Sequence, residues 1–130
     1  MIHPSFFDEH LEKRKEQQLY RTLPESFEGV DFASNDYLGL NSQEPGTTGH
    51  ALTSGGSRLL TGNHPVYKEC EEAIARFHNA TSALIFNSGY QANLSVLSTV
   101  ARKEDTILYD QKVHASIRDG IRLSNAVSRN

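Results

Sequence analysis

The alternation of helical and strand patterns after residue 63 constrains the fold of this chain most. Residues 64–78, 90–102 and 114–124 carry apolar side chains at helical spacing. Between them, residues 83–86 and 106–109 form short apolar runs that predict strands. The order helix, strand, helix, strand, helix is typical of an α/β fold with a mostly parallel sheet. Two strands do not make a stable sheet, so the sequence predicts an incomplete one.

The residues before this alternation predict less regular structure. Residues 5–21 predict a polar helix that Ser5 caps and Pro24 ends, with an apolar stripe too thin for a core helix. Residues 30–40 predict a short strand that runs into a turn, and residues 41–57, rich in Gly, Thr and Ser, predict a loop. After residue 124 we expect no further element.

Composition and charge narrow the classes of partner and compartment. The net charge is −3 and no face is obviously basic, which argues against a nucleic-acid partner. No apolar run approaches membrane-spanning length, and the first residues show no secretory signal, so we expect a cytoplasmic protein without a membrane partner. The single cysteine, Cys70, fits a reducing compartment and is expected to be a small core residue. The histidines show no ligand spacing, so we expect no metal site.

The turn Ser88-Gly89-Tyr90 is the first candidate binding segment. It follows a predicted buried strand and opens a predicted helix. The free N–H groups of a first helical turn, together with the helix dipole, favour a phosphate or a carboxylate. The alternative interpretation is a plain strand-to-helix turn in which Ser88 is only the N-cap.

Two further segments have weaker signals. Gly55 and Gly56 would let the backbone approach a ligand closely, and Arg58 could pair with an anion, although a flexible connector explains the same residues. His114 follows a predicted strand, where α/β folds place ligands. A surface histidine or a helix N-cap is the alternative for His114.

Five segments of the chain stand in a characteristic order and spacing. They are Ser34-Asn35-Asp36-Tyr37-Leu38-Gly39-Leu40, Ser54-Gly55-Gly56-Ser57-Arg58, Gly62-Asn63-His64-Pro65, Ser88-Gly89-Tyr90-Gln91-Ala92-Asn93 and His114-Ala115-Ser116-Ile117-Arg118-Asp119-Gly120. Together these segments resemble those of the α-oxoamine synthases, the class II pyridoxal-phosphate-dependent acyltransferases. The resemblance implies an aminotransferase-like, fold-type I enzyme that joins an amino acid to an acyl-CoA with loss of carbon dioxide, using pyridoxal 5'-phosphate.

Within the family, the sequence is most similar to the branch that makes 8-amino-7-oxononanoate in biotin biosynthesis. The Gly-Gly-Ser-Arg loop followed by Asn63-His64-Pro65 carries this similarity. The 2-amino-3-ketobutyrate branch usually shows Ser-Cys-Phe at residues 88–90, and the aminolevulinate branch usually shows Asn at the position of Leu59.

The resemblance also implies roles for individual residues. For the cofactor, it implies that backbone N–H groups of Ser88, Gly89 and Tyr90 bind the phosphate and that His114 stacks on the pyridine ring. For the substrates, it implies roles for three residues: Asn35 at the substrate mouth, Arg21 beside the acyl-CoA, and Ser57 near the acyl group, often across a homodimer interface.

The resemblance implies a division of the chain and a limit on its activity. Residues 1–24 would form an amino-terminal helical arm, and residues 25–130 the first part of the large cofactor-binding domain. Residues 41–53 are shorter than the usual family segment. No lysine of the sequence stands in the family's Schiff-base lysine motif, and the acidic partner of the pyridine nitrogen is likewise unmatched. Because the reaction needs both groups, we expect the 130-residue chain to be inactive alone.

Two other functions remain as alternatives. One is a non-catalytic, truncated family member that acts as a binding or subunit-interaction module. The other is a generic nucleotide binder, which the absence of Gly-Lys-Ser/Thr and of Gly-x-Gly-x-x-Gly argues against.

Overall fold

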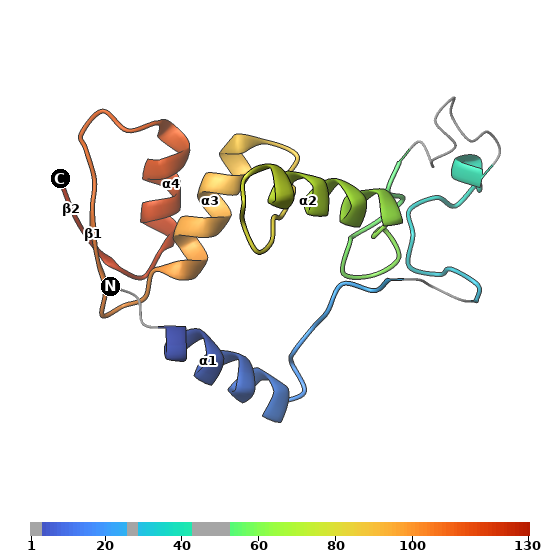
Figure 1. Cartoon of the computed structure of the whole chain (residues 1–130), viewed down its shortest axis with the longest axis horizontal. Coiled ribbons are helices and arrows are strands. Elements are labelled where there is room, and N and C mark those ends of the chain that lie inside the picture. The colour runs from blue at the N-terminus through green and yellow to red at the C-terminus, as the bar shows by residue number, and fades with distance from the viewer. Residues whose placement is uncertain (1–3, 26–28, 43–52) are drawn as a thin grey trace. The chain divides into compact units, whose positions relative to one another are not determined.

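The computed structural model describes residues 4–25, 29–42 and 53–130. The chain divides into two compact units, Met1–Ala83 and Leu84–Asn130. The first unit contains helix α1 (Pro4–Glu16), the 3-10 helix η1 (Leu40–Ser42) and helix α2 (Pro65–Phe77). The second unit contains helix α3 (Gly89–Val100), strand β1 (Thr106–Leu108), helix α4 (Ala115–Leu123) and strand β2 (Val127–Arg129) (Figure 1).

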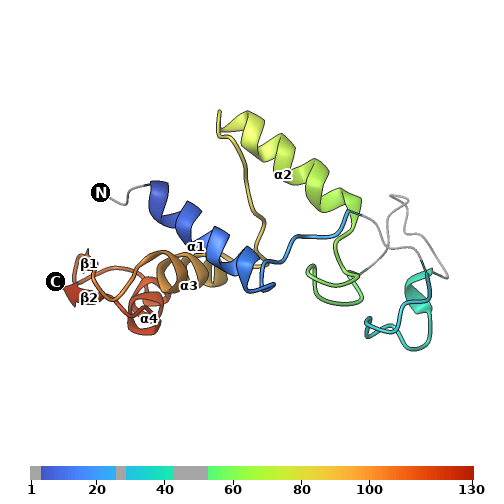
Figure 2. The ribbon, with the colours of Figure 1, turned by 90° about the horizontal axis from the view of Figure 1, so that it is seen from below.

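The second unit contains the predicted α/β arrangement. Strands β1 and β2 are parallel, with Thr106 opposite Val127, and α4 connects them (Figure 1). Helices α3 and α4 pack side by side, as both views of the ribbon show (Figures 1 and 2). Gly120 permits this close approach, because a Cβ atom there would lie 2.9 Å from Cβ of Leu97. Ile121 of α4 is buried in this unit. The parallel sheet and both helices confirm the predicted α/β class, although β1 pairs with β2 and not with residues 83–86.

Helix α2 has the predicted bounds but not the predicted burial. His64 is its N-cap residue, and Pro65 occupies the first turn, where a missing N–H costs no hydrogen bond. The face expected to be core is exposed: Ile74 is 43% and Phe77 82% accessible, and the Cys70 side chain is also exposed. The core assignment of Cys70 was therefore wrong. The reason is that no described helix of the first unit packs extensively on α2.

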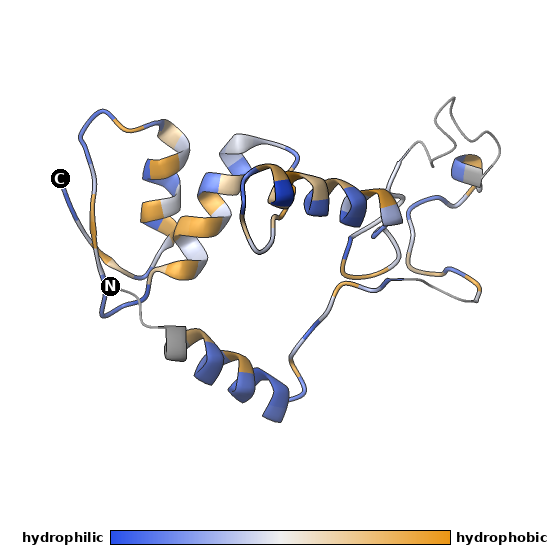
Figure 3. Cartoon of the chain, viewed as in Figure 1, coloured by the Kyte–Doolittle hydropathy of each residue, from blue (hydrophilic) through white to orange (hydrophobic). Residues whose placement is uncertain are grey.

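Helix α1 is shorter than expected and begins earlier. It ends at Glu16, well before Pro24, because the chain leaves the helix through Gln18, whose φ is +56°. The helix begins at Pro4, so Ser5 is a helical residue and not the N-cap. Hydrophilic residues dominate α1, whereas apolar residues are frequent on α3 and α4 (Figure 3).

Three expected features of the remaining chain differ from the structure. Residues 30–40 form bends and turns, because Asp31 accepts hydrogen bonds from the backbone of Ala33 and Ser34 and thereby competes with strand pairing. Residues 83–86 pair with no described strand. Strand β2 was missed, because a three-residue strand with one apolar side chain gives almost no periodic signal. Most of the predicted loop 41–57 lies outside the described residues.

Candidate functional site

The start of α3 has the features of an anion-binding site, namely an N-cap residue and backbone N–H groups without an acceptor among the described residues. Ser88 is the N-cap, and its Oγ accepts a hydrogen bond of 3.2 Å from the backbone N–H of Gln91. The N–H of Ala92 donates to the carbonyl of Ser88. No described residue accepts a hydrogen bond from the N–H of Gly89 or Tyr90. A Cβ atom on Gly89 would meet nothing within 4 Å, so the space beside this residue is open. The turn can therefore receive an anion.

The side chain of Tyr90 connects this turn to α4. Its hydroxyl donates a hydrogen bond to Oδ2 of Asp119, and Arg122 contacts the other carboxylate oxygen of Asp119 at 3.2 Å. The hydrogen bond to Asp119 raises the pKa of Tyr90 above the ordinary tyrosine value, because it stabilises the neutral phenol. The Tyr90 ring also meets the His114 ring edge-on, with centroids 6.2 Å apart.

His114 is the N-cap residue of α4, which was one of the alternatives that the sequence left open. Its Nδ1 lies 2.7 Å from Oγ of Ser116 and accepts a hydrogen bond of 3.2 Å from the backbone N–H of Ser116. Asn93 of α3 donates to the same Ser116 oxygen at 2.9 Å. Ser116 is completely buried. Sequence reasoning missed Ser116 and Asn93 as site residues. A polar residue two positions after an N-cap candidate is the one signal that would have pointed to Ser116.

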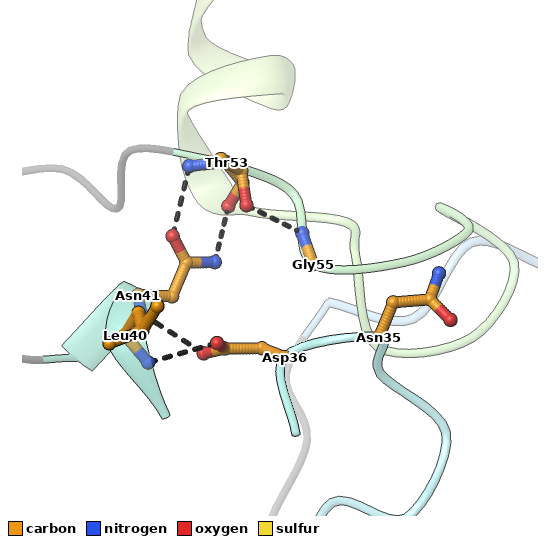
Figure 4. Close-up of a pocket in the computed structure, with 6 residues that line it drawn as sticks. All are labelled: Asn35, Asp36, Leu40, Asn41, Thr53 and Gly55. Carbon is orange, nitrogen blue, oxygen red and sulfur yellow. Dashed lines mark hydrogen bonds between the residues drawn. The ribbon is translucent and has the colours of Figure 1, made fainter. Parts of the chain in front are cut away.

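In the first unit, Asn35 lies in a ring of polar contacts. Its backbone N–H donates to the carbonyl of Gly55 at 2.6 Å. Asp36 accepts from the backbone of Leu40 and Asn41, and the Asn41 amide exchanges two hydrogen bonds with the backbone of Thr53 (Figure 4). Asn35, Asp36, Leu40, Asn41, Thr53 and Gly55 line a pocket of about 470 Å³.

Ser57 and Arg58 follow this pocket along the chain. Ser57 Oγ accepts from the backbone of Leu59, so this hydroxyl caps a local turn. Arg58 forms two hydrogen bonds with Glu71, at 2.7 and 3.0 Å, and its guanidinium lies 4.4 Å from the centroid of the Tyr67 ring. The charge of Arg58 is therefore already matched inside the protein, which argues against the anion-binding interpretation of this residue.

The predicted site residues fall into two groups. Ser88, Gly89, Tyr90 and His114 lie together in the second unit, and the Tyr90–His114 ring contact joins them. Asn35 and Ser57 belong to the first unit, where the Asn35–Gly55 hydrogen bond brings Asn35 to the glycine loop. Arg21 is in the first unit too, is exposed, and pairs with no described residue.

The described residues offer no candidate for two other classes of site. Within the described ranges, no three or more His, Cys, Asp or Glu side chains gather in a way that could hold a metal ion. None of the described helices combines the length and the apolar character needed to cross a membrane.

The sequence matches one protein-family model and many curated proteins. The family model described as aminotransferase class I and II matches residues 28–130. An 8-amino-7-oxononanoate synthase of Emericella nidulans is 43% identical over 132 residues, which cover 90% of this chain and 32% of that protein. An 8-amino-7-oxononanoate synthase of Chlorobaculum parvum is 40% identical, covering 94% of this chain and 38% of that protein. The chain thus spans about a third of the length of these relatives.

Solved structures give the same picture of the fold. The chain is similar to the serine palmitoyltransferase of Sphingomonas wittichii, with a TM-score of 0.59 and 27% identity over 98% of this chain and 38% of that one. A further structure, of an SPT variant solved with PLP, has a TM-score of 0.58 and 26% identity over 95% of this chain and 37% of that one.

Proposed function

Because this chain belongs to the aminotransferase class I and II family, we propose that it is a segment of a pyridoxal-phosphate-dependent acyltransferase. The reaction we propose for the whole protein condenses an amino acid with an acyl-CoA and releases carbon dioxide, as in 8-amino-7-oxononanoate synthases of biotin biosynthesis. The names of the relatives, at 40–43% identity, support this proposal. The single structural observation that carries it is the open turn at the start of α3, which lies in one unit with His114.

The residues at the start of α3 fit the phosphate of the cofactor. The N–H groups of Gly89 and Tyr90 have no acceptor among the described residues, and the helix dipole adds positive potential at this end. Gly89 leaves room for close approach, since a Cβ there would project into open space. Ser88 fixes the turn by capping Gln91. These three residues would hold the phosphate.

His114 would stack on the pyridine ring of the cofactor. Bound pyridoxal phosphate supplies an electron-accepting ring for bond changes at the α-carbon of an amino acid. His114 contributes an exposed ring whose orientation is restrained at Nδ1 by Ser116. Tyr90 lies edge-on to that ring at a centroid distance of 6.2 Å, which further limits its motion.

On the substrate side, we propose the roles that the resemblance implies for the first unit. Asn35 would meet the amino-acid substrate, Ser57 the acyl group and Arg21 the acyl-CoA. The pocket beside Asn35 and the exposed, unpaired guanidinium of Arg21 within the described chain support these roles.

For the whole protein we further propose a homodimer in the cytoplasm, without a nucleic-acid or membrane partner. A lone cysteine and a net charge of −3 agree with that setting.

We propose that these 130 residues alone do not catalyse the reaction. A lysine that holds the cofactor covalently needs a depressed pKa. Lys15 and Lys68 have the opposite property, because hydrogen bonds to Glu12 and Glu25 raise the pKa of each lysine. Neither these lysines nor Lys13, Lys103 and Lys112 stand in the family's lysine motif.

The exposed apolar side chains favour the alternative function of a subunit-interaction module. Phe32 is 93%, Tyr37 86% and Phe77 82% accessible, far more than is usual for such side chains in a self-contained domain. Sedimentation of the chain alone, and with the remaining two thirds of a relative such as the Chlorobaculum parvum enzyme, would test this function. A specific one-to-one complex without acyltransferase activity would favour it over the enzyme segment.

The phosphate site is tested by binding pyridoxal phosphate and pyridoxal to the 130-residue chain. We expect phosphate-dependent binding that dialysis reverses, and no adduct on a single lysine after borohydride reduction. The variant Gly89→Asp should weaken the binding of pyridoxal phosphate roughly tenfold or more, because it sets a carboxylate against the phosphate while still suiting a helix start. Asn125→Asp adds the same charge in the loop between α4 and β2 and serves as the matched control.

Either of two results would contradict this proposal. Equal affinity for pyridoxal and pyridoxal phosphate would show that no phosphate site exists at α3. A borohydride-stable adduct on one lysine would show that the chain contains its own covalent anchor, and the expectation of inactivity would then be wrong.

A further inference from the structure

We propose that Asn93 and Ser116 are positioning residues that hold neutral His114 in a single tautomer, with the proton on Nε2 and a lone pair on Nδ1. The inference rests on the proposed function in one respect: His114 is taken as the residue that meets the cofactor ring. The tautomer itself follows from hydrogen bonds within the second unit. The inference gives Asn93 and Ser116 a role that does not require either residue to contact a ligand.

The backbone of Ser116 determines what Nδ1 can be. The N–H of Ser116 lies 3.2 Å from Nδ1 of His114, in the geometry of an N-cap hydrogen bond. A backbone N–H can only donate, so this hydrogen bond favours the state in which Nδ1 presents a lone pair. An imidazole whose Nδ1 accepts carries its one exchangeable proton on Nε2 when it is neutral.

The hydroxyl of Ser116 supports the same tautomer. Its oxygen lies 2.7 Å from Nδ1 and accepts a hydrogen bond of 2.9 Å from the amide of Asn93. Because the Asn93 amide occupies the oxygen as a donor, the one hydroxyl proton of Ser116 is free to point at Nδ1. Two donors from Ser116 therefore converge on one nitrogen. The direction of donation runs from Asn93 through Ser116 to His114.

Burial makes this short chain of hydrogen bonds selective. Ser116 has no accessible surface, so water does not compete for its hydroxyl. Asn93 belongs to α3 and Ser116 to α4, whose close approach at Gly120 fixes the distance between them. The helix packing and the state of the imidazole are thus coupled. The exposed His114 ring is held in one plane before any ligand arrives, which lowers the ordering cost of stacking.

The test is a nitrogen NMR measurement on the 130-residue chain labelled with ¹⁵N-histidine, at a pH where the imidazole is neutral and without cofactor. We expect the Nδ1 resonance of His114 at the position of an unprotonated, pyridine-type nitrogen, and Nε2 at that of a protonated, pyrrole-type nitrogen. His114→Gln identifies the signals by their loss. Finding the proton on Nδ1 in the unaltered chain would overturn the inference, and this result needs no variant of Asn93 or Ser116.

A variant that reverses the donor sharpens the test. In Asn93→Asp a carboxylate accepts the Ser116 hydroxyl proton, so the oxygen can offer Nδ1 only a lone pair. We expect the Nδ1 resonance to move only part of the way toward the pyrrole-type position, because the backbone N–H of Ser116 still donates to Nδ1. Asn125→Asp adds the same charge without touching this network and should leave both resonances in place. Unchanged resonances in Asn93→Asp, with the backbone amides of α3 and α4 still at their native shifts, would remove Asn93 from the proposal.

The removal of the hydroxyl tests Ser116 separately. Ser116→Ala keeps the backbone N–H and introduces no added volume at the buried position. We expect the pyridine-type character of Nδ1 to decrease, since one of two donors is lost, and the His114 ring to show faster motion in ¹³C relaxation. An unchanged ring signal would contradict a role for the hydroxyl. Because these measurements contain no pyridoxal phosphate, a failed cofactor titration would count against the proposed function and not against the tautomer.

Discussion

The helix pair α3 and α4 and the glycine loop of residues 54–62 are stabilised in different ways. The helices approach through small and apolar residues, with Gly120 against Leu97 and Ile121 buried. The loop is held by polar groups, among them the two hydrogen bonds from Arg58 to Glu71. Among the described residues each unit buries one apolar side chain, Ala75 in the first and Ile121 in the second, so the units differ in their helix contacts and not in the number of buried apolar side chains.

The difference indicates which part of the chain specifies its own structure. Packed apolar contacts between neighbouring helices form from local sequence, and they place Tyr90 beside His114. Hydrogen bonds in a loop fix a geometry, but each contributes only about 1 kcal/mol and does not replace a core. Phe32 and Phe77 of the first unit are exposed, although phenylalanine is usually found in a protein core. We infer that the second unit is the more self-sufficient of the two.

The largest effect is expected from Gly62→Ala in the glycine loop. Gly62 is buried, and a Cβ atom on it would overlap the carbonyl group of Gly56, which is backbone and cannot move aside as a side chain can. We expect a loss of about 3 kcal/mol in the local stability of this loop. Hydrogen exchange of the amides of Leu60 and Gly62, which both donate to Ser57, would measure it.

Gly89→Ala is the control for this substitution, because its Cβ would meet nothing within 4 Å. Unchanged exchange at Leu60 and Gly62 in the Gly62→Ala variant would mean that the loop does not adopt this closed geometry. A parallel loss of protection in α3 and α4 would instead mean that the two units do not differ in self-sufficiency.

The next effect is expected from Arg58→Met. The variant keeps most of the side-chain volume but removes the hydrogen bonds to Glu71 and to Asn63 and leaves the Glu71 carboxylate less well satisfied. The Arg58 side chain is 20% and the Glu71 side chain 14% accessible, so solvent replaces these bonds poorly. We expect a loss of about 2 kcal/mol in the stability of the first unit, measured by denaturant titration of its amide signals.

Lys68→Met, on the helix that carries Glu71, is the matched control. The Lys68–Glu25 pair is highly exposed, with side chains 61% and 80% accessible, and such pairs contribute little. Equal losses for Arg58→Met and Lys68→Met would refute the view that the partly buried Arg58–Glu71 pair holds this loop.

A smaller effect is expected from Gly120→Ala in the helix pair. The new Cβ would lie 2.9 Å from Cβ of Leu97 and 3.0 Å from the carbonyl oxygen of Asn93, so the helices must separate slightly. Alanine also favours the helix by up to about 1 kcal/mol relative to glycine, which offsets part of the steric cost. We expect a net loss of about 1 kcal/mol. A gain in the melting temperature of the second unit would show that α3 and α4 are not closely packed.

The same contrast explains which parts of the structure could be predicted from the sequence. Helices α2, α3 and α4 and strand β1 carry strong local periodicity, and their existence was predicted correctly. The strand expected at residues 30–40 was not found, because Asp31 and Asp36 fold that segment into turns through their carboxylates. Burial of α2 was predicted wrongly, because periodicity shows which face is apolar and not whether another element covers it.

The candidate site followed the same rule. Ser88 was recognisable as a cap from its place before a helix, and His114 from its place after a strand. Ser116 and Asn93 were not recognisable, because the two residues lie 23 positions apart in the sequence and meet only where two helices approach each other. The match of Arg58 with Glu71 likewise required the structure, since the pairing is tertiary.

The smallest effect concerns the ionisation of Tyr90 in the second unit. Its folded pKa is raised, first by the hydrogen bond to Asp119 and then by desolvation and the Asp119 charge, with Arg122 opposing. The neutral phenol is the stabilised form, so the contribution to folding is complete below the unfolded value of about 10 and is lost as the pH rises through the folded pKa. We expect Tyr90 to ionise at a pH above the ordinary tyrosine value.

An ultraviolet titration of the chain, minus that of Tyr90→Phe, isolates the Tyr90 phenolate signal. In Asp119→Asn the acceptor carboxylate is replaced by a neutral amide, so the Tyr90 midpoint should fall toward the ordinary tyrosine value. Glu104→Gln removes a carboxylate from the turn before β1 and should leave the midpoint unchanged. If the titration midpoint of Tyr90 is the same in Asp119→Asn as in the unaltered chain, the phenol does not form a hydrogen bond to α4. The contact between α3 and α4 would then rest on side-chain packing and on the Asn93–Ser116 hydrogen bond, and the second unit would depend less on polar contacts than the glycine loop does.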